Sequence, residues 1–209
     1  MKDVKELILK INEIKPKING VVRERLEKFR SFEKLDDKFW FSELVFCILT
    51  ANTSAEMGIK IQNSISPEEF ASLSYEELRD RLKSLKYRFY NTRARYIYEN
   101  QVYAGRIKDT VKSLEKDEKR NWLIENIKGF GFKESSHFLR NVGFFDYAII
   151  DKHIFNLMRE YNLTDDIKIN SKNYIILEGI LRDLSKIFSM SLGELDLYLW
   201  YLKTGKVLK

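Results

Sequence analysis

Cysteine, proline and histidine are scarce in this 209-residue chain, and long apolar runs are missing. The one cysteine, Cys47, excludes an intramolecular disulfide and a zinc or iron–sulfur site built from four cysteines. No apolar run approaches the roughly 20 residues that a membrane-spanning helix needs. Residues 1–5 lack the apolar core of a secretory signal. We therefore expect a soluble, cytoplasmic protein with no membrane partner.

Positive charge is in excess, because the chain has 37 lysines and arginines but only 31 aspartates and glutamates, which gives a net charge of +6. Such an excess favours a polyanionic partner, since phosphates attract cations and release counterions on binding. Hydrophobic residues make up 44% of the chain, so a sizeable core can form. Charge alone does not distinguish a nucleic-acid-binding protein from other basic domains.

Helical patterns follow one another along almost the whole chain, so an all-α fold is expected. Only two prolines occur, and apolar residues recur at three- and four-residue spacing. Serines that begin capping boxes, Ser66, Ser74 and Ser191, mark three helix starts. The expected helices are, approximately, 2–15, 17–33, 37–51, 54–64, 67–72, 74–84, 90–104, 117–127, 133–142, 151–161, 171–189 and 191–203.

Two glycines one residue apart, Gly129 and Gly131, separate two helical patterns and indicate a tight hairpin. Glycine permits positive φ and the close approach of another backbone. Phe130 between them is expected to point into the core. The amides of such a loop, followed by the N-terminus of a helix, suit a DNA phosphate. An ordinary packing corner between two helices explains the same spacing equally well.

Lys133 and Asp151, 18 positions apart, make the pattern around the hairpin more specific. Residues 127–133 (Ile-Lys-Gly-Phe-Gly-Phe-Lys), followed by residues 149–153 (Ile-Ile-Asp-Lys-His), resemble the helix–hairpin–helix signature of the base-excision DNA glycosylase superfamily. The chain departs from that signature at Lys128, which stands where proline is common and adds a phosphate-seeking charge.

Three further segments, residues 46–52, 133–141 and 195–209, resemble the compact archaeal-type 8-oxoguanine DNA glycosylase/lyases. With them, the resemblance covers essentially the whole chain. The branch of the superfamily that removes oxidised pyrimidines normally has a cysteine cluster for iron and sulfur near its C-terminus. This chain has no such cluster, which argues against that branch.

The resemblance implies an all-α, two-lobed helix–hairpin–helix glycosylase fold with a DNA-binding cleft. Residues 1–209 would form one glycosylase unit, with one lobe at about 36–130, the other made of 1–35 plus 131–209, and the hairpin at 117–142. The protein would be a monomer that acts on double-stranded DNA containing 8-oxoguanine or abasic sites, beside the chromosomal DNA. No cofactor or metal is required, although the hairpin carbonyls suit a monovalent cation.

The resemblance also implies a bifunctional reaction at Lys133 and Asp151. The amine of Lys133 would attack C1′ of the sugar and displace the base, and the resulting Schiff base permits β-elimination, which nicks the strand. Asp151 would stabilise the positive charge on the sugar and assist proton transfer. Alternatively, Lys133 is a solvated lysine at a helix start and Asp151 only caps the helix that begins at Lys152.

Three residues are expected to recognise the damaged base. 8-Oxoguanine carries a hydrogen on N7 where guanine has an acceptor, so a discriminating pocket needs an acceptor there. The resemblance assigns that role to the terminal carboxylate of Lys209. Trp200 would stack on the flipped base and Phe89 would wedge between bases. The alternatives are a frayed chain end for Lys209 and core packing of the last helix for Trp200.

Asn52, Arg88 and Arg93 are expected to contact the DNA outside the hairpin. Asn52 would fill the gap that the flipped base leaves, and its alternative role is a helix cap. Arg88 and Arg93 lie in a run of cations and aromatics, residues 86–96, that suits phosphates. The same run also fits the buried face of an amphipathic helix.

The hairpin supplies the remaining expected contacts. Lys128, Gly129 and Gly131 would hold a DNA phosphate. His137, one turn after Lys133 on the same face, could tune the pocket. Neither of the two histidines has neighbouring ligands that suggest zinc.

Three other functions remain open on the sequence alone. The chain could be a helix–hairpin–helix glycosylase for another damaged base, a non-catalytic DNA-binding module that grips phosphates with the hairpin, or a helical adaptor that binds protein. A substrate panel separates the glycosylases, and an adaptor would show no salt-dependent affinity for DNA.

Overall fold

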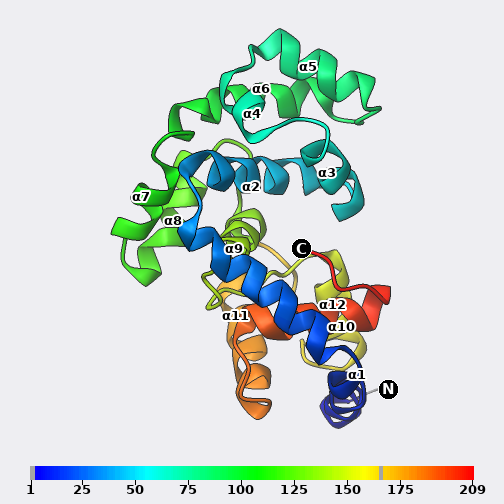
Figure 1. The fold of residues 1–209 in the computed structure, drawn as a ribbon. Helices are drawn as coiled ribbons and strands as arrows, with labels where there is room; N and C mark the ends of the chain where they lie inside the picture. The colour runs from blue at the N-terminus through cyan, green and yellow to red at the C-terminus, as the bar shows by residue number, and fades with distance from the viewer. Residues whose placement is uncertain (1–2, 165–166) are drawn as a thin grey trace. The chain divides into compact units, whose positions relative to one another are not determined.

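A computed structural model of the chain describes residues 3–164 and 167–209, which form helices joined by turns, without a strand (Figure 1). The expected all-α class is confirmed. The helices are α1 (Val4–Ser31), η1 (Phe32–Lys34), α2 (Asp37–Thr50), α3 (Ala55–Gln62), α4 (Pro67–Ser72), α5 (Tyr75–Ser84), α6 (Tyr90–Asn100), η2 (Gln101–Tyr103), α7 (Ile107–Ser113), α8 (Lys116–Asn126), α9 (Phe132–Asn141), α10 (Lys152–Glu160), α11 (Ser171–Ile187) and α12 (Leu192–Thr204).

The chain divides into two compact units. Unit 1 consists of Met1–Arg30 and Leu139–Lys209, and unit 2 consists of Ser31–Phe138. Unit 1 therefore contains nearly all of α1 together with α10, α11 and α12, whereas unit 2 contains α2 to α8. Helix α9 begins in unit 2 and ends in unit 1.

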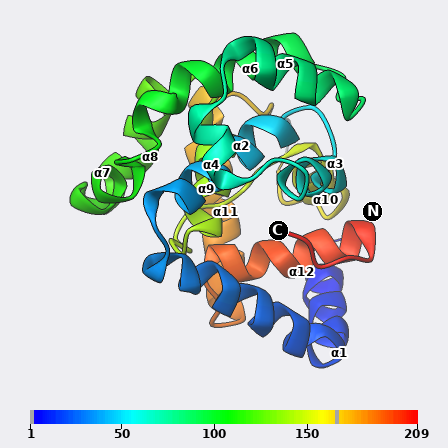
Figure 2. The same ribbon diagram turned by 45° about the horizontal axis from the view of Figure 1, so that its top comes forward.

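Helix α2 forms the core of unit 2. After its first turn, every residue from Trp40 to Thr50 is buried. A helix that is apolar around its whole circumference has to be covered by neighbours, and α3, α4, α6 and α7 pack against it (Figure 2). Gly58 lets α3 approach closely, because a Cβ at that position would lie 2.8 Å from a ring carbon of Phe46.

The three helix starts predicted from capping serines are confirmed. Ser66 forms a capping box with Glu69 at the start of α4. Ser74 forms another with Glu77 at the start of α5, which packs beside α6. The side chain of Ser191 accepts a hydrogen bond from a backbone amide in the first turn of α12. Local sequence therefore fixes these three boundaries.

Helix α12 forms the core of unit 1, with α10 and α11 packed against it. Most of its first two turns is buried. Hydrogen bonds between described residues join α1 to the rest of the unit. Lys10 Nζ donates to the hydroxyl of Tyr161 at 3.0 Å, and the hydroxyl of Tyr198 donates to Asn19 Oδ1 at 3.2 Å.

Helix α1 differs from the prediction of separate helices at 2–15 and 17–33. One helix runs through Val4–Ser31, with Pro16 inside it. Proline removes one helical hydrogen bond, yet the buried stripe of α1 continues on both sides of it, with Ile11 before and Ile18 after. Packing of this continuous stripe within unit 1 therefore outweighs the local preference for a break.

Helix α7 was not predicted, because its seven residues carry too short a pattern. A long-range contact holds it: the carboxylate of Asp37 accepts a hydrogen bond from the Lys108 amide at 2.7 Å. Lys108 Nζ also donates to the carbonyl of Leu35 at 2.9 Å. These partners lie more than 70 positions apart in the chain, so no local signal reveals them.

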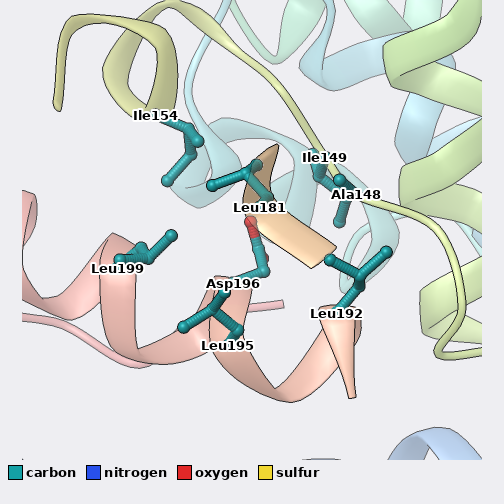
Figure 3. A pocket seen from close by; sticks show the side chains of 8 residues that line it. All are labelled: Ala148, Ile149, Ile154, Leu181, Leu192, Leu195, Asp196 and Leu199. Carbon is teal, nitrogen blue, oxygen red and sulfur yellow. The ribbon is translucent and has the colours of Figure 1, made fainter. Parts of the chain in front are cut away.

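A buried ion pair joins the end of α9 to α12 in unit 1. Arg140 donates to the Asp196 carboxylate, and the side chains are 3% and 9% exposed. Burial raises the pKa of Asp196 to about 6, although the charge of Arg140 acts in the opposite direction. Figure 3 shows this carboxylate in a pocket otherwise lined by apolar side chains: Ala148, Ile149, Ile154, Leu181, Leu192, Leu195 and Leu199.

We expect Asp196→Asn to change how stability depends on pH. Because the pKa of Asp196 is raised on folding, the folded protein binds this proton more tightly than the unfolded chain does. The contribution of this group to the free energy of unfolding is therefore largest below about pH 4 and is lost as the pH rises to about 6, by roughly 3 kcal/mol. Denaturant unfolding of both proteins across this range measures the difference.

Asp183→Asn is the matched control, because Asp183 pairs with Lys186 on the exposed surface of α11. The free energy of unfolding of wild type minus that of Asp196→Asn should fall as the pH rises. The same difference for Asp183→Asn should not change with pH. Parallel curves for wild type and Asp196→Asn would mean that burial does not perturb Asp196.

Candidate functional site

The hairpin between α8 and α9 is built on one glycine in a left-handed conformation. Gly129 has a φ of +89°, and a Cβ there would lie 2.6 Å from Cδ2 of Tyr96. Both the backbone angle and the neighbouring ring therefore require glycine. Phe130 is buried as predicted, and its ring lies 6.1 Å from that of Phe138 in α9.

Gly131 has a different role from Gly129. The φ of Gly131 is not positive. The atom nearest to a Cβ added at Gly131 would be Glu134 Oε2, at 3.5 Å. The carbonyl of Gly131 accepts the amide of Ser135 at 3.0 Å, which starts α9, and its amide donates to Glu134 Oε2 at 3.3 Å. The expectation that both glycines supply special backbone geometry holds for Gly129 only.

Asn100, at the end of α6, holds the first residue of the hairpin with two hydrogen bonds. Its Nδ2 donates to the Lys128 carbonyl and its Oδ1 accepts the Lys128 amide, both at 3.0 Å. Asn100 is 1% exposed. Sequence reasoning missed this residue, because nothing near position 100 signals a partner 28 positions away.

Lys133 lies in the first turn of α9 with its side chain 23% exposed. Its Nζ is 3.2 Å from Oε1 of Glu134, whose other oxygen holds the Gly131 amide. Glu134 therefore links the predicted nucleophile to the backbone of the hairpin. Sequence reasoning gave it no role, although a carboxylate three residues after a turn glycine is a signal for capping.

Asp151 lies in unit 1 and caps α10. Its Oδ1 accepts the Ile154 amide at 2.8 Å, so the predicted capping role is confirmed. Its negative charge also contributes to the raised pKa of Asp196, after burial, which has the larger effect. Lys133 belongs to unit 2. The catalytic role of Asp151 stays a prediction.

Trp200 lies on α12 and is partly buried. This burial agrees with the alternative interpretation, in which Trp200 packs the last helix. The ring of His153 meets its ring edge-on, with centroids 5.3 Å apart. The indole Nε1 is buried and has no hydrogen-bond partner among the described residues. After Gly205, which ends α12 with a φ of +70°, residues 207–209 are partly buried. The base-recognition roles of Trp200 and Lys209 stay predictions.

Residues 86–96 include both buried and exposed side chains. The buried ones fit the interpretation as the core face of an amphipathic helix, and the exposed ones fit the interpretation as a DNA-contacting surface. Ala94 is buried with the core of unit 2, whereas Arg88 is exposed. Phe89 is partly exposed, and its ring lies 5.0 Å from the guanidinium of Arg88 and 5.7 Å from that of Arg93. A partly exposed aromatic ring with two guanidiniums over it combines groups that are suited to contact bases and phosphates.

Asn52 follows Ala51, the C-cap residue of α2, and is exposed, with a φ of +62°. Arg93 holds this turn, because its Nη2 donates to the carbonyl of Ala51 at 3.1 Å. His137 is buried instead, and its ring meets that of Phe46 edge-on at 5.6 Å. DNA contacts by Asn52 and His137 stay predictions.

The described residues contain no group of three or more histidine, cysteine, aspartate and glutamate side chains placed to hold a metal ion. The monovalent cation at the hairpin stays a prediction. No helix in the described part of the chain is long and apolar enough to cross a membrane.

Comparisons with known proteins agree over nearly the whole chain. A family model described as 8-oxoguanine DNA glycosylase matches residues 22–190. The 8-oxoguanine DNA glycosylase/AP lyase of Methanocaldococcus jannaschii is 48% identical over 207 residues, which is 97% of this chain and 99% of that protein. The enzyme of the same name from Thermoplasma volcanium is 46% identical over 191 residues, covering 90% and 92%.

Solved structures show the same fold. The crystal structure of the M. jannaschii 8-oxoguanine glycosylase/lyase in complex with a 15mer DNA containing 8-oxoguanine has a TM-score of 0.93 at 47% identity, covering 97% of this chain and 99% of that one. The 8-oxoguanine DNA glycosylase of Thermotoga maritima has a TM-score of 0.92 at 40% identity, covering 98% and 99%. The predicted helix–hairpin–helix glycosylase fold is confirmed.

The two hairpin glycines give a matched pair of variants. We expect Gly129→Ala to lower the free energy of unfolding by about 2 kcal/mol or more, because an L-residue is strained at this φ and its Cβ meets Tyr96. Gly131→Ala has no positive φ, and its Cβ would make only an ordinary contact with Glu134 Oε2, so it should cost under about 1 kcal/mol. Denaturant unfolding measures both, and equal losses would contradict the distinct roles of the two glycines.

Proposed function

Because the chain belongs to the 8-oxoguanine DNA glycosylase family, we propose that it removes 8-oxoguanine from double-stranded DNA and cleaves the strand at the resulting abasic site. The observation that carries the proposal is the position of Lys133, in the first turn of the helix that follows the hairpin. A nucleophile there would sit directly beside the backbone that is proposed to hold the DNA.

The ε-amine of Lys133 is the proposed nucleophile. It attacks C1′ of the sugar, and the bond to the base breaks, so that the base departs with the bonding electrons and takes up a proton. The sugar ring then opens: the C1′–O4′ bond breaks, O4′ takes up the remaining amine proton, and an imine between Nζ and C1′ results. Removal of a proton from C2′ then expels the 3′ phosphate and nicks the strand. Before the attack, the amine has to lose its proton and leave Glu134.

Asp151 has two proposed tasks. One carboxylate oxygen caps α10, and the negative charge stabilises the positive sugar that forms as the base departs. A carboxylate held by a backbone amide keeps its orientation without any change in the protein during the reaction. The same group therefore serves the fold and the chemistry.

DNA binding is proposed to use exposed cations around the hairpin and the turn after α2. Lys128 is exposed at the hairpin, and the N-terminus of α9 adds a positive dipole end that suits a phosphate. Asn52, Arg88 and Phe89 would act on the strand at the flipped base. We also propose that Trp200 and the carboxylate of Lys209 recognise the damaged base. The protein is proposed to act inside the cell as a monomer.

The first test is a duplex with one 8-oxoguanine, incubated with the protein and borohydride. Reduction of the imine traps a covalent protein–DNA adduct, which establishes the amine nucleophile and the base together. An adduct that forms only on an abasic duplex would support the lyase activity and would show that 8-oxoguanine is not the substrate. No adduct on either duplex would favour a non-catalytic DNA-binding module.

We expect Lys133→Gln to lose the adduct and to reduce nicking by roughly a thousandfold or more, because the imine cannot form without the amine. Binding to the 8-oxoguanine duplex should remain. Lys186→Gln, which alters an exposed lysine of α11, is the control and should nick like wild type. Full nicking by Lys133→Gln would remove Lys133 from the mechanism.

Asp151→Asn separates capping from chemistry, because asparagine caps a helix as well as aspartate does. We expect the melting temperature to stay within a few degrees of wild type. Base release in single-turnover experiments should slow by roughly a hundredfold or more, since the neutral amide does not stabilise the sugar cation. An unchanged rate would leave Asp151 with its capping role alone.

A further inference from the structure

One face of α6 contacts two segments of unit 2 that are proposed to meet DNA. Arg93, Tyr96 and Asn100 lie three and four positions apart, so they share a side of the helix. Arg93 contacts the backbone at Ala51, Tyr96 lies against Gly129, and Asn100 bonds the backbone of Lys128. These contacts all lie within Ser31–Phe138.

At one end of this face, Arg93 holds the turn that presents Asn52. Its Nη2 donates to the carbonyl of Ala51, the C-cap residue directly after α2. The guanidinium also lies 5.4 Å from the centroid of the Tyr96 ring. Arg93 is therefore fixed by an aromatic neighbour while it restrains the turn.

At the other end, Tyr96 and Asn100 hold the hairpin. The Tyr96 ring occupies the space that a Cβ of Gly129 would need. Asn100 bonds both the amide and the carbonyl of Lys128 at 3.0 Å. Two bonds from one buried, planar side chain fix the position and the direction of the peptide groups on either side of Lys128.

We propose that α6 is a rigid spacer that sets the distance between the hairpin and the Asn52 turn, and that Asn100 is the positioning residue that fixes its hairpin end. The proposal rests on the proposed function, in which both segments bind one DNA duplex. Asn100 does not contact the DNA or the reacting atoms. It acts through the peptide groups of Lys128, which fix the position of the adjoining Gly129 backbone that is proposed to receive the phosphate.

This role predicts a loss of affinity without a loss of chemistry. With Asn100→Ala, the hairpin keeps its sequence and Lys133 keeps its place in α9, but the Lys128 peptide groups lose both partners. We expect binding of the 8-oxoguanine duplex to weaken roughly tenfold, by fluorescence anisotropy. The single-turnover rate at saturating protein should stay within about threefold of wild type.

Gln101→Ala is the matched control. The neighbouring Gln101 also makes two bonds from its side-chain amide to backbone, donating to the carbonyls of Phe70 and Leu73 at 3.0 and 2.8 Å. These partners lie at and after the end of α4, away from the hairpin. We expect Gln101→Ala to lose stability to a similar degree and to keep its DNA affinity within about twofold.

Hydrogen exchange gives a readout that does not depend on the reaction. The Lys128 amide is bonded to Asn100, so its protection should fall in Asn100→Ala and stay at the wild-type level in Gln101→Ala. Should Asn100→Ala not fold, Asn100→Asp replaces it, because the carboxylate accepts the Lys128 amide but cannot donate to the Lys128 carbonyl. Its affinity is expected to fall as well.

Equal DNA affinity of the Asn100 and Gln101 variants, or unchanged protection of the Lys128 amide in Asn100→Ala, would overturn the proposal that α6 is a spacer. A saturating rate that falls as much as the affinity would also overturn it, because Asn100 would then serve the chemistry. Failure of wild type to nick the 8-oxoguanine duplex would overturn the proposed function instead, and the exchange measurement would still decide whether Asn100 holds the hairpin.

Discussion

The conformation of Gly129 is the constraint on which the arrangement of unit 2 depends. A left-handed glycine lets the chain reverse between α8 and α9 over a few residues, and only a glycine leaves room for Tyr96. A reversal this tight leaves polar backbone groups that need partners inside the protein. Asn100 and Glu134 supply them on the two sides of Gly129.

The position of Lys133 follows from the same constraint together with the apolar core. Helix α9 packs its Phe138 against Trp40 of α2, with ring centroids 6.2 Å apart, and His137 against Phe46. Because α2 is buried along almost its whole length, it is a fixed support for α9. The end of α9 that follows the hairpin then presents Lys133, still partly exposed, beside backbone that is proposed to receive a phosphate.

Sequence reasoning succeeded where a signal is local. Capping serines such as Ser66, the hairpin glycines and the helical periodicity gave the all-α class and most helix boundaries. It failed where distant packing decides, as in the continuation of α1 through Pro16 and the contact between Asp37 and Lys108. The same limit applies to the site: Lys133 and Asp151 stand out by their spacing, whereas Asn100 is an unremarkable asparagine in the sequence.

Asn100 also decides which backbone groups of the hairpin stay available to other partners. Ile127, directly before Lys128, has an extended backbone, with φ and ψ of −98° and 117°. An unpaired extended segment can recruit a second chain by strand pairing. The amide of Asn100 occupies both bonding positions of Lys128, as a neighbouring strand would. Neither backbone group of Lys128 is therefore left for strand pairing with a second chain.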